Sequence, residues 1–257
     1  MLQRAVLGFF AAMFIALVAR RTGSLSRSGA VAATLIGAGC AAAGYAWAAL
    51  LIVYFVASVA LSRFGRTARE ARTASVIAKG GARDATQVLA NGGVFAALAL
   101  LSTSDATLAV AALGALAASA ADTWATEIGT LYGGTPRSIL GGKAVSAGMS
   151  GGMTLAGSAA MIVGALFVAI VAAMLSLPRA IAIVAGAGIA GAMTDTLLGA
   201  TLQERRWCAS CEQFSERAVH DCGEPTTQSG GLAWMNNDVV NVFATLAGGT
   251  AGALLAL

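Results

Sequence analysis

The sequence predicts an all-α integral membrane protein, a polytopic bundle of about eight transmembrane helices. Its 257 residues are 58% hydrophobic and only 11% charged, whereas a soluble domain averages about 25% charged residues. Too few charges are present to coat a soluble surface. Long apolar runs alternate with short polar segments, and the basic residues gather in every second segment. These observations define the fold class, and we interpret residues 1–257 as a single transmembrane domain.

Eight apolar runs are long enough, or nearly so, to cross a hydrocarbon layer of about 30 Å. Alanine and glycine dominate them, and small residues let neighbouring helices approach closely in lipid. The second and fourth runs give the weakest signal. The first run precedes Arg20-Arg21, which is typical of a stop-transfer flank, so we interpret it as a retained span rather than a signal peptide. The predicted spans are 5–19, 29–45, 46–62, 88–103, 106–127, 150–176, 180–203 and 238–256.

The basic residues predict the orientation. With eight spans, four loops share one side of the membrane, and they hold 14 of the 16 Lys and Arg residues, all except Arg4 and Arg179. The positive-inside rule makes this side cytoplasmic and leaves both termini outside. We expect the inner (plasma) membrane of a bacterium. The net charge of +4 does not indicate a nucleic-acid partner, because the basic residues do not line one soluble face. The four loops are 20–28, 63–87, 128–149 and 204–237.

Three predicted spans carry an aspartate in their cytoplasmic half: Asp122, Asp195 and Asp238. Carboxylates inside a membrane are costly and usually functional. We expect these three to be catalytic and to hold Mg²⁺, which binds oxygen ligands together with substrate phosphates. Glu127 joins the catalytic candidates and is placed at the end of its helix. The alternative is that each carboxylate merely pairs with a neighbouring hydroxyl, amide or arginine.

Two cytoplasmic loops combine basic residues with glycines, one around residues 79–84 and one at 133–143. Glycines let backbone amides approach an anion, and a helix N-terminus adds positive potential. We therefore expect phosphate binding, the alternative for Arg137 and Lys143 being anchoring at lipid headgroups. The candidate ligands of a nucleotide or phosphate are Lys79, Arg83, Asp84, Asn91, Arg137, Lys143, Asn237 and Asn241. Headgroup anchoring is the preferred interpretation of Arg63, Arg66, Arg69 and Arg72.

Two glycine motifs do not indicate nucleotide binding. Residues 186–191 fit the dinucleotide pattern, but they lie in an apolar span with no preceding strand, so helix packing explains them better. Gly142-Lys143 is not a P-loop, because Ala144 replaces Ser or Thr and the leading glycine is missing. Any nucleotide chemistry must therefore use another architecture.

The segment 204–236 is predicted to be a cytoplasmic loop with a zinc-binding hairpin. Cys208 and Cys211 form a C-x₂-C pair, and His220 and Cys222 follow. Four such ligands are typical of a closed, structural zinc site. The alternative is a set of reduced thiols without metal. His220 is the only histidine of the chain, so we expect no histidine-based catalysis elsewhere.

Five stretches spread over nearly the whole chain form a recognisable set: Asn91-Gly92-Gly93, residues 121–129 with their Asp-Thr-Trp-Ala block, Gly151-Gly152, residues 195–200 and residues 236–241. In order and spacing they resemble the family of transmembrane protein 19 and plant phytyl-phosphate kinase (the domain of unknown function 92 family), which is similar to dolichol kinases and phosphatidate cytidylyltransferases. The resemblance implies a CTP-dependent, Mg²⁺-requiring membrane enzyme that converts an isoprenyl monophosphate to a diphosphate.

The residues and the resemblance together favour a lipid-phosphate kinase. Its partners would be a nucleoside triphosphate, with CTP favoured, and a membrane isoprenyl or phytyl monophosphate; homo-oligomerisation stays open. One alternative is a proton- or cation-coupled transporter, although such proteins usually place their sites at the midplane between inverted repeats. A second alternative is a CTP-dependent lipid cytidylyltransferase.

Overall fold

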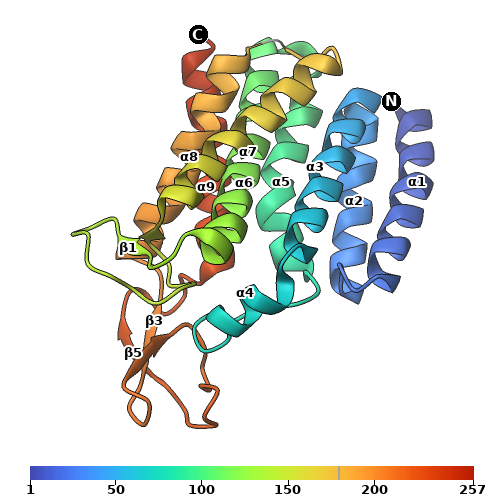
Figure 1. Ribbon diagram of the computed structural model, residues 1–257. Helices are drawn as coiled ribbons and strands as arrows, with labels where there is room; N and C mark the ends of the chain where they lie inside the picture. Colours follow the sequence, from blue (N-terminus) through green and yellow to red (C-terminus); the bar gives the residue numbers. More distant parts are fainter. Residues whose placement is uncertain (179) are drawn as a thin grey trace.

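The computed structural model describes residues 1–178 and 180–257, and it forms a bundle of long helices with irregular structure at one end (Figure 1). Arg179, which the sequence analysis places in an outer loop, lies outside the described residues. The helices are α1 (Leu2–Arg21), α2 (Arg27–Ala43), α3 (Tyr45–Arg63), α4 (Arg66–Thr73), α5 (Ala85–Leu101), the 3₁₀ turn η1 (Ser102–Ser104), α6 (Ala106–Tyr132), α7 (Leu155–Met174), α8 (Ile181–Thr201) and α9 (Asn237–Leu255).

The predicted all-α membrane bundle is confirmed. Six helices, α1, α3, α6, α7, α8 and α9, are long and apolar enough to cross a membrane within the described ranges. The second and fourth predicted spans are also helices, α2 and α5, but each has only 17 residues. At 1.5 Å per residue they measure about 26 Å, which is shorter than a hydrocarbon layer of about 30 Å.

Helix α6 forms the centre of the bundle and packs against α5, α7, α8 and α9. Every residue from Ala109 to Ala121 is buried. Glycines bring the neighbouring backbones close, because a Cβ on Gly114 would lie 2.4 Å from the carbonyl oxygen of Gly248 in α9. The dinucleotide-like residues 186–191 lie inside α8, where Gly188 and Gly191 face Ala117 and Ala118 of α6. Those glycines therefore serve helix packing, as predicted.

The polar loops gather at the end of the bundle opposite the two termini (Figure 1). Strands β1 (Arg137–Ser138) and β2 (Gly152–Met153) pair in antiparallel fashion. Strands β3 (Arg205–Cys208), β4 (Gln213–Ser215) and β5 (Thr227–Gly230) form an antiparallel sheet in the order β4-β3-β5. The short helix α4 lies at the same end, and residues Leu25 and Arg83 bridge two of the loops. The predicted grouping of the loops at one end agrees with this arrangement.

Two predicted boundaries are wrong. The span predicted at 150–176 begins as a helix only at Leu155, because Gly151 has a left-handed backbone (φ 81°) and Thr154 caps the helix by accepting from the Gly157 amide. Helix α6 continues to Tyr132, so Glu127 lies within it and not at its end. The helix ends only where Gly133 caps it and Gly134 takes a left-handed backbone (φ 67°).

Candidate functional site

A cavity of about 380 Å³ lies at the polar end of the bundle, between α6, α7, α8 and the start of α9. It is lined by six of the predicted carboxylate and cationic residues and by Asn237. The structure thus brings together residues from segments far apart in the sequence. The predicted residues that line the cavity are Lys79, Arg83, Asp122, Glu127, Asp195, Asn237 and Asp238.

Asp122 of α6 and Asp195 of α8 both line this cavity. The Oδ2 atom of Asp195 is buried and has no hydrogen-bond partner among the residues the structure describes. An oxygen of this kind costs about 1–3 kcal/mol unless something binds it. The pair therefore has the donor chemistry and the unsatisfied oxygen that a hard cation requires.

Asp238 has a different environment from the other two aspartates. It lies in the first turn of α9 and is 8% exposed. Its Oδ2 atom accepts from Lys79 Nζ at 2.5 Å and from Thr86 Oγ1 at 2.8 Å. The charge of Asp238 is therefore already balanced by protein groups, and its role here is to hold Lys79 at the cavity.

Lys79 is held by two carboxylates, because Asp84 Oδ2 also lies 3.0 Å from its Nζ atom. Burial lowers the pKa of Lys79, but its hydrogen bonds and charge interactions with Asp238 and Asp84 outweigh this effect and raise the pKa above its usual value. Asp84 caps α5 by accepting from the Gln87 amide, and this bond, followed by those from Thr86 and Lys79, lowers its pKa to about 2. Asp84 thus acts on the cavity through Lys79 and the helix start.

Glu127 forms an ion pair with Arg69 of α4, with 2.6 Å between Oε2 and Nε, and it accepts from Ser62 of α3 at 2.6 Å. The predicted headgroup anchoring does not describe three of the four arginines. Arg69 is bound to Glu127, Arg63 donates to Thr22 O, and Arg72 donates to Leu131 O and Gly134 O. Only Arg66 forms an exposed pair along its own helix, with Glu70.

A second, larger cavity of about 650 Å³ adjoins the first and is bordered by basic side chains. Lys79, Arg83 and Glu127 form part of the wall that the two cavities share. A cavity rich in carboxylates therefore adjoins one rich in basic side chains. The basic residues of the second cavity are Arg63, Arg66, Arg69, Lys79, Arg83 and Arg217.

Five of the eight predicted phosphate ligands do not line the first cavity. The Arg137 guanidinium donates to Gly142 O within its own loop, and Lys143 is exposed. Asn91 donates to Gln87 O and accepts from Ser119 Oγ, which also bonds Tyr54 Oη. The loop 133–143 closes on itself, while the backbone around Gly151 packs against Ala200 of α8. Asp84 and Asn241 likewise lie outside the lining residues of this cavity.

Glu216 is a cavity residue that the sequence analysis missed. It follows β4, and its Oε1 atom accepts from Ser150 Oγ at 2.5 Å and from Gln203 Nε2 at 2.8 Å. Burial raises the pKa of Glu216 to about 7, although the hydrogen bonds from Ser150 oppose this shift. The sequence offered one signal for Glu216, its position between the predicted metal ligands Cys211 and His220. A hairpin that folds around its ligands holds the residues between them in fixed positions.

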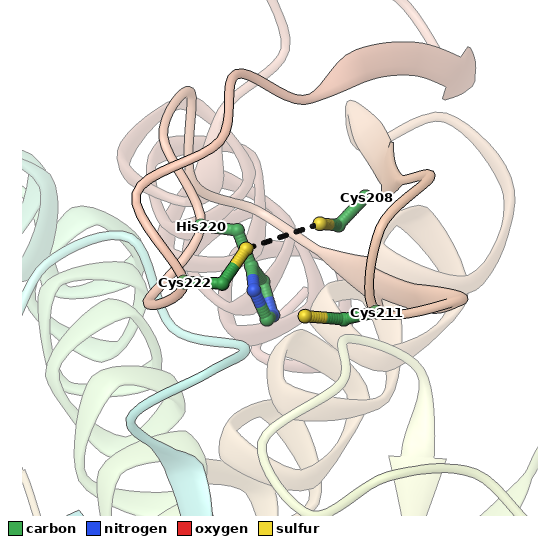
Figure 2. A group of neighbouring side chains, drawn as sticks. All are labelled: Cys208, Cys211, His220 and Cys222. Carbon is green, nitrogen blue, oxygen red and sulfur yellow. Dashed lines mark hydrogen bonds between the residues drawn. The ribbon is translucent and has the colours of Figure 1, made fainter.

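The predicted zinc ligands come together at the sheet. One ligand atom from each of Cys208, Cys211, His220 and Cys222 lies within 4.8 Å of all the others. In Figure 2 the imidazole of His220 lies between the cysteine side chains. The Sγ atoms of Cys208 and Cys222 are 3.6 Å apart, and all four cysteines of the chain are free thiols.

The comparisons with known proteins agree with a membrane protein. The family model described as Integral membrane protein DUF92 matches residues 10–249. Protein PGR of Arabidopsis thaliana is 29% identical over 269 residues, which are 92% of this chain and 92% of that protein. An uncharacterized membrane protein of Methanocaldococcus jannaschii is 28% identical over 216 residues, which are 82% of this chain and 77% of that protein. Protein VTE6, chloroplastic, of Arabidopsis thaliana is 29% identical over 228 residues, which are 85% of this chain and 61% of that protein. No solved structure matches the chain.

Proposed function

Because this chain belongs to the Integral membrane protein DUF92 family, we propose that it is a phosphotransferase that converts an isoprenyl or phytyl monophosphate to its diphosphate. The family match agrees with the resemblance carried by the Asp-Thr-Trp-Ala block at residues 122–125. In this reaction an oxygen of the lipid monophosphate attacks the γ-phosphorus of a nucleoside triphosphate, with CTP favoured. The bond from that phosphorus to the β,γ-bridging oxygen breaks, leaving a nucleoside diphosphate and the lipid diphosphate.

The observation that carries this proposal is the buried, unpartnered Oδ2 of Asp195 in a cavity that also holds Asp122 and two cations. Phosphoryl transfer needs little covalent chemistry from a protein, and relies on positioning and on balancing phosphate charge. Acidic and basic side chains in adjoining cavities suit that task. Asp122 and Asp195 would hold Mg²⁺, which would neutralise charge on the phosphate oxygens when bound.

The cationic side chains have distinct roles in this proposal. Asp238 and Asp84 fix the Lys79 ammonium at the shared wall of the cavities. Arg83 donates to Ser62 Oγ at 3.1 Å, which directs its guanidinium toward the basic cavity where phosphates would lie.

The test is an assay of purified protein with labelled CTP or ATP and a panel of isoprenyl monophosphates. Asp195→Asn keeps the size of the side chain and removes its charge, so activity should fall about 100-fold or more. Asp105→Asn is the matched control, because this residue caps the far end of α6 and asparagine also caps helices. Asp105→Asn should keep the parental rate.

Three outcomes separate this proposal from its rivals. Formation of a nucleoside diphosphate and a lipid diphosphate supports the kinase. Release of pyrophosphate with a cytidylated lipid would indicate a cytidylyltransferase. Proton- or cation-coupled uptake into proteoliposomes, abolished by Asp195→Asn with no nucleotide consumed, would refute the kinase in favour of a transporter.

A further inference from the structure

The loop between α8 and α9 joins a cluster of metal-binding side chains to the cavity. We propose that Cys208, Cys211, His220 and Cys222 bind one zinc ion, and that this ion holds residues Ser215–Arg217 in place so that Glu216 completes the carboxylate set of the cavity. The zinc site would therefore control the affinity of the cavity for Mg²⁺. The role of Glu216 rests on the proposed function, whereas the binding of zinc does not.

The distances fit a tetrahedral zinc site. Zinc–sulfur bonds of about 2.3 Å place two tetrahedral thiolate ligands about 3.8 Å apart. The Sγ atoms of Cys208 and Cys222 are separated by 3.6 Å, which is far longer than the disulfide length of about 2.05 Å. Three thiolates and one imidazole are typical of closed, structural zinc sites.

His220 provides an independent observation that points to a ligand. It is only 5% exposed, and neither Nδ1 nor Nε2 has a hydrogen-bond partner among the described residues. A buried imidazole with both nitrogens unsatisfied is unfavourable in the absence of a ligand. Figure 2 shows the ring directed toward the cysteine sulfurs, where a metal would bind one of its nitrogens.

The segment between the two ligand pairs is attached to the wall of the cavity. Ser215 Oγ donates to Ser75 O at 2.8 Å, and the Glu216 amide donates to Val76 O at 2.9 Å. Arg217 donates to Ala74 O at 2.8 Å. These carbonyl groups follow α4 and precede Lys79, so the zinc loop holds the segment that carries this cation.

Glu216 reaches the cavity from this segment. Gln203, which follows the C-terminal end of α8, and Ser150 orient its carboxylate. Glu216 and Asp195 both line this cavity, so the two carboxylates belong to one site. Mg²⁺ requires near-ideal octahedral geometry, and it therefore binds weakly when an oxygen ligand is missing or displaced. Glu216 gives the cavity a carboxylate that comes from the loop after β4 and not from a membrane helix.

The first experiment measures metal content by elemental analysis of protein purified without chelators. We expect about one zinc per chain in the parent and at most about one tenth of that in Cys211→Ser. Cys40→Ala is the control, because Cys40 lies in α2 and belongs to no metal cluster within the described residues, and it should keep its zinc. Zinc-free parent protein with four titratable thiols would refute the site.

The second experiment measures Mg²⁺ binding without any substrate, from the rise of the unfolding temperature as Mg²⁺ is added. Glu216→Gln should weaken apparent Mg²⁺ affinity by about 10–100-fold. Cys211→Ser, or removal of zinc with a zinc-selective chelator, should weaken it in the same direction, and added zinc should restore it after chelation. Glu224→Gln is the control, because this carboxylate is exposed in the same loop.

The outcomes distinguish this inference from the proposed function. Mg²⁺ affinity that is unchanged by both Glu216→Gln and removal of zinc would refute the coupling, even if Cys211→Ser fails to fold. A protein that carries zinc and shows Mg²⁺ binding dependent on Glu216, but turns over no isoprenyl phosphate, would support the inference and refute the kinase.

Discussion

The ion pair between Arg69 and Glu127 should contribute far more to stability than the pair between Arg66 and Glu70, although both arginines belong to α4. The side chains of the first pair are 13% and 16% exposed, and those of the second are both 53% exposed. Hydrogen bonds to charged groups contribute about 1.5–3 kcal/mol, whereas exposed pairs one helical turn apart contribute about 0.3–0.5 kcal/mol. The two arginines of this short helix therefore allow a matched comparison of a buried and an exposed ion pair.

Replacement of Arg69 by methionine should cost about 3 kcal/mol, because it leaves Glu127 as a largely buried charge. The guanidinium also donates to Ser62 O and Phe64 O at the end of α3, so this loss mixes several contacts. A double-mutant cycle with Arg69→Met and Glu127→Gln removes those other contributions. We expect a coupling energy of about 2 kcal/mol, near the middle of the range for charged hydrogen bonds.

The assay is equilibrium unfolding in mixed detergent micelles, followed by circular dichroism. The same cycle with Arg66→Met and Glu70→Gln is the control and should give about 0.5 kcal/mol or less. If the two coupling energies agree, burial of the first pair does not strengthen it, and the reasoning is wrong. A large effect of Arg66→Met alone would equally contradict the assignment of that residue to the surface.

Two further predictions concern orientation and packing. A cysteine that replaces Thr103 should react with an impermeant thiol reagent in intact cells, whereas one that replaces Gly80 should not. The positive-inside rule places the loop of Gly80 in the cytoplasm. The reverse labelling pattern would show that the predicted orientation is wrong. Gly114→Ala should lower the unfolding temperature, because the added Cβ would lie 2.4 Å from Gly248 O. Gly186→Ala is the control: its Cβ would meet nothing within 4 Å, so this substitution should leave the unfolding temperature unchanged or raise it. Equal effects of the two alanine substitutions would show that α6 and α9 do not pack as closely as described.

The helices could be predicted from the sequence because long apolar runs are the segments that a lipid bilayer can surround. The boundary at residues 150–154 could not, since Ser150-Gly151-Gly152 looks like the start of an alanine- and glycine-rich span. Its turn depends on the left-handed conformation of Gly151 and on close contact with Ala200, which lies far along the chain. Tertiary contact, and not local composition, sets that boundary.

The candidate site was predicted in part for a similar reason. Asp122 and Asp195 stand out because a carboxylate within an apolar run is rare. Glu216 lies in a polar loop, where an acid carries no such contrast. Arg137 was predicted to bind phosphate because glycines surround it in the loop. In the structure the same loop folds back, and the Arg137 guanidinium donates to Gly142 O.

The contact between Lys79 and Asp238 has a consequence for biogenesis, because the two residues are 159 positions apart. At about 5–20 residues per second, Asp238 is synthesised roughly 8–30 s after Lys79. During that interval Gly114 and the other small residues of α6 lack the surface of α9 that later covers them. The insertion machinery must therefore shield a helix with an exposed polar end and a stripe of glycine and alanine. The cavity acquires its last wall only when α9 enters the bundle.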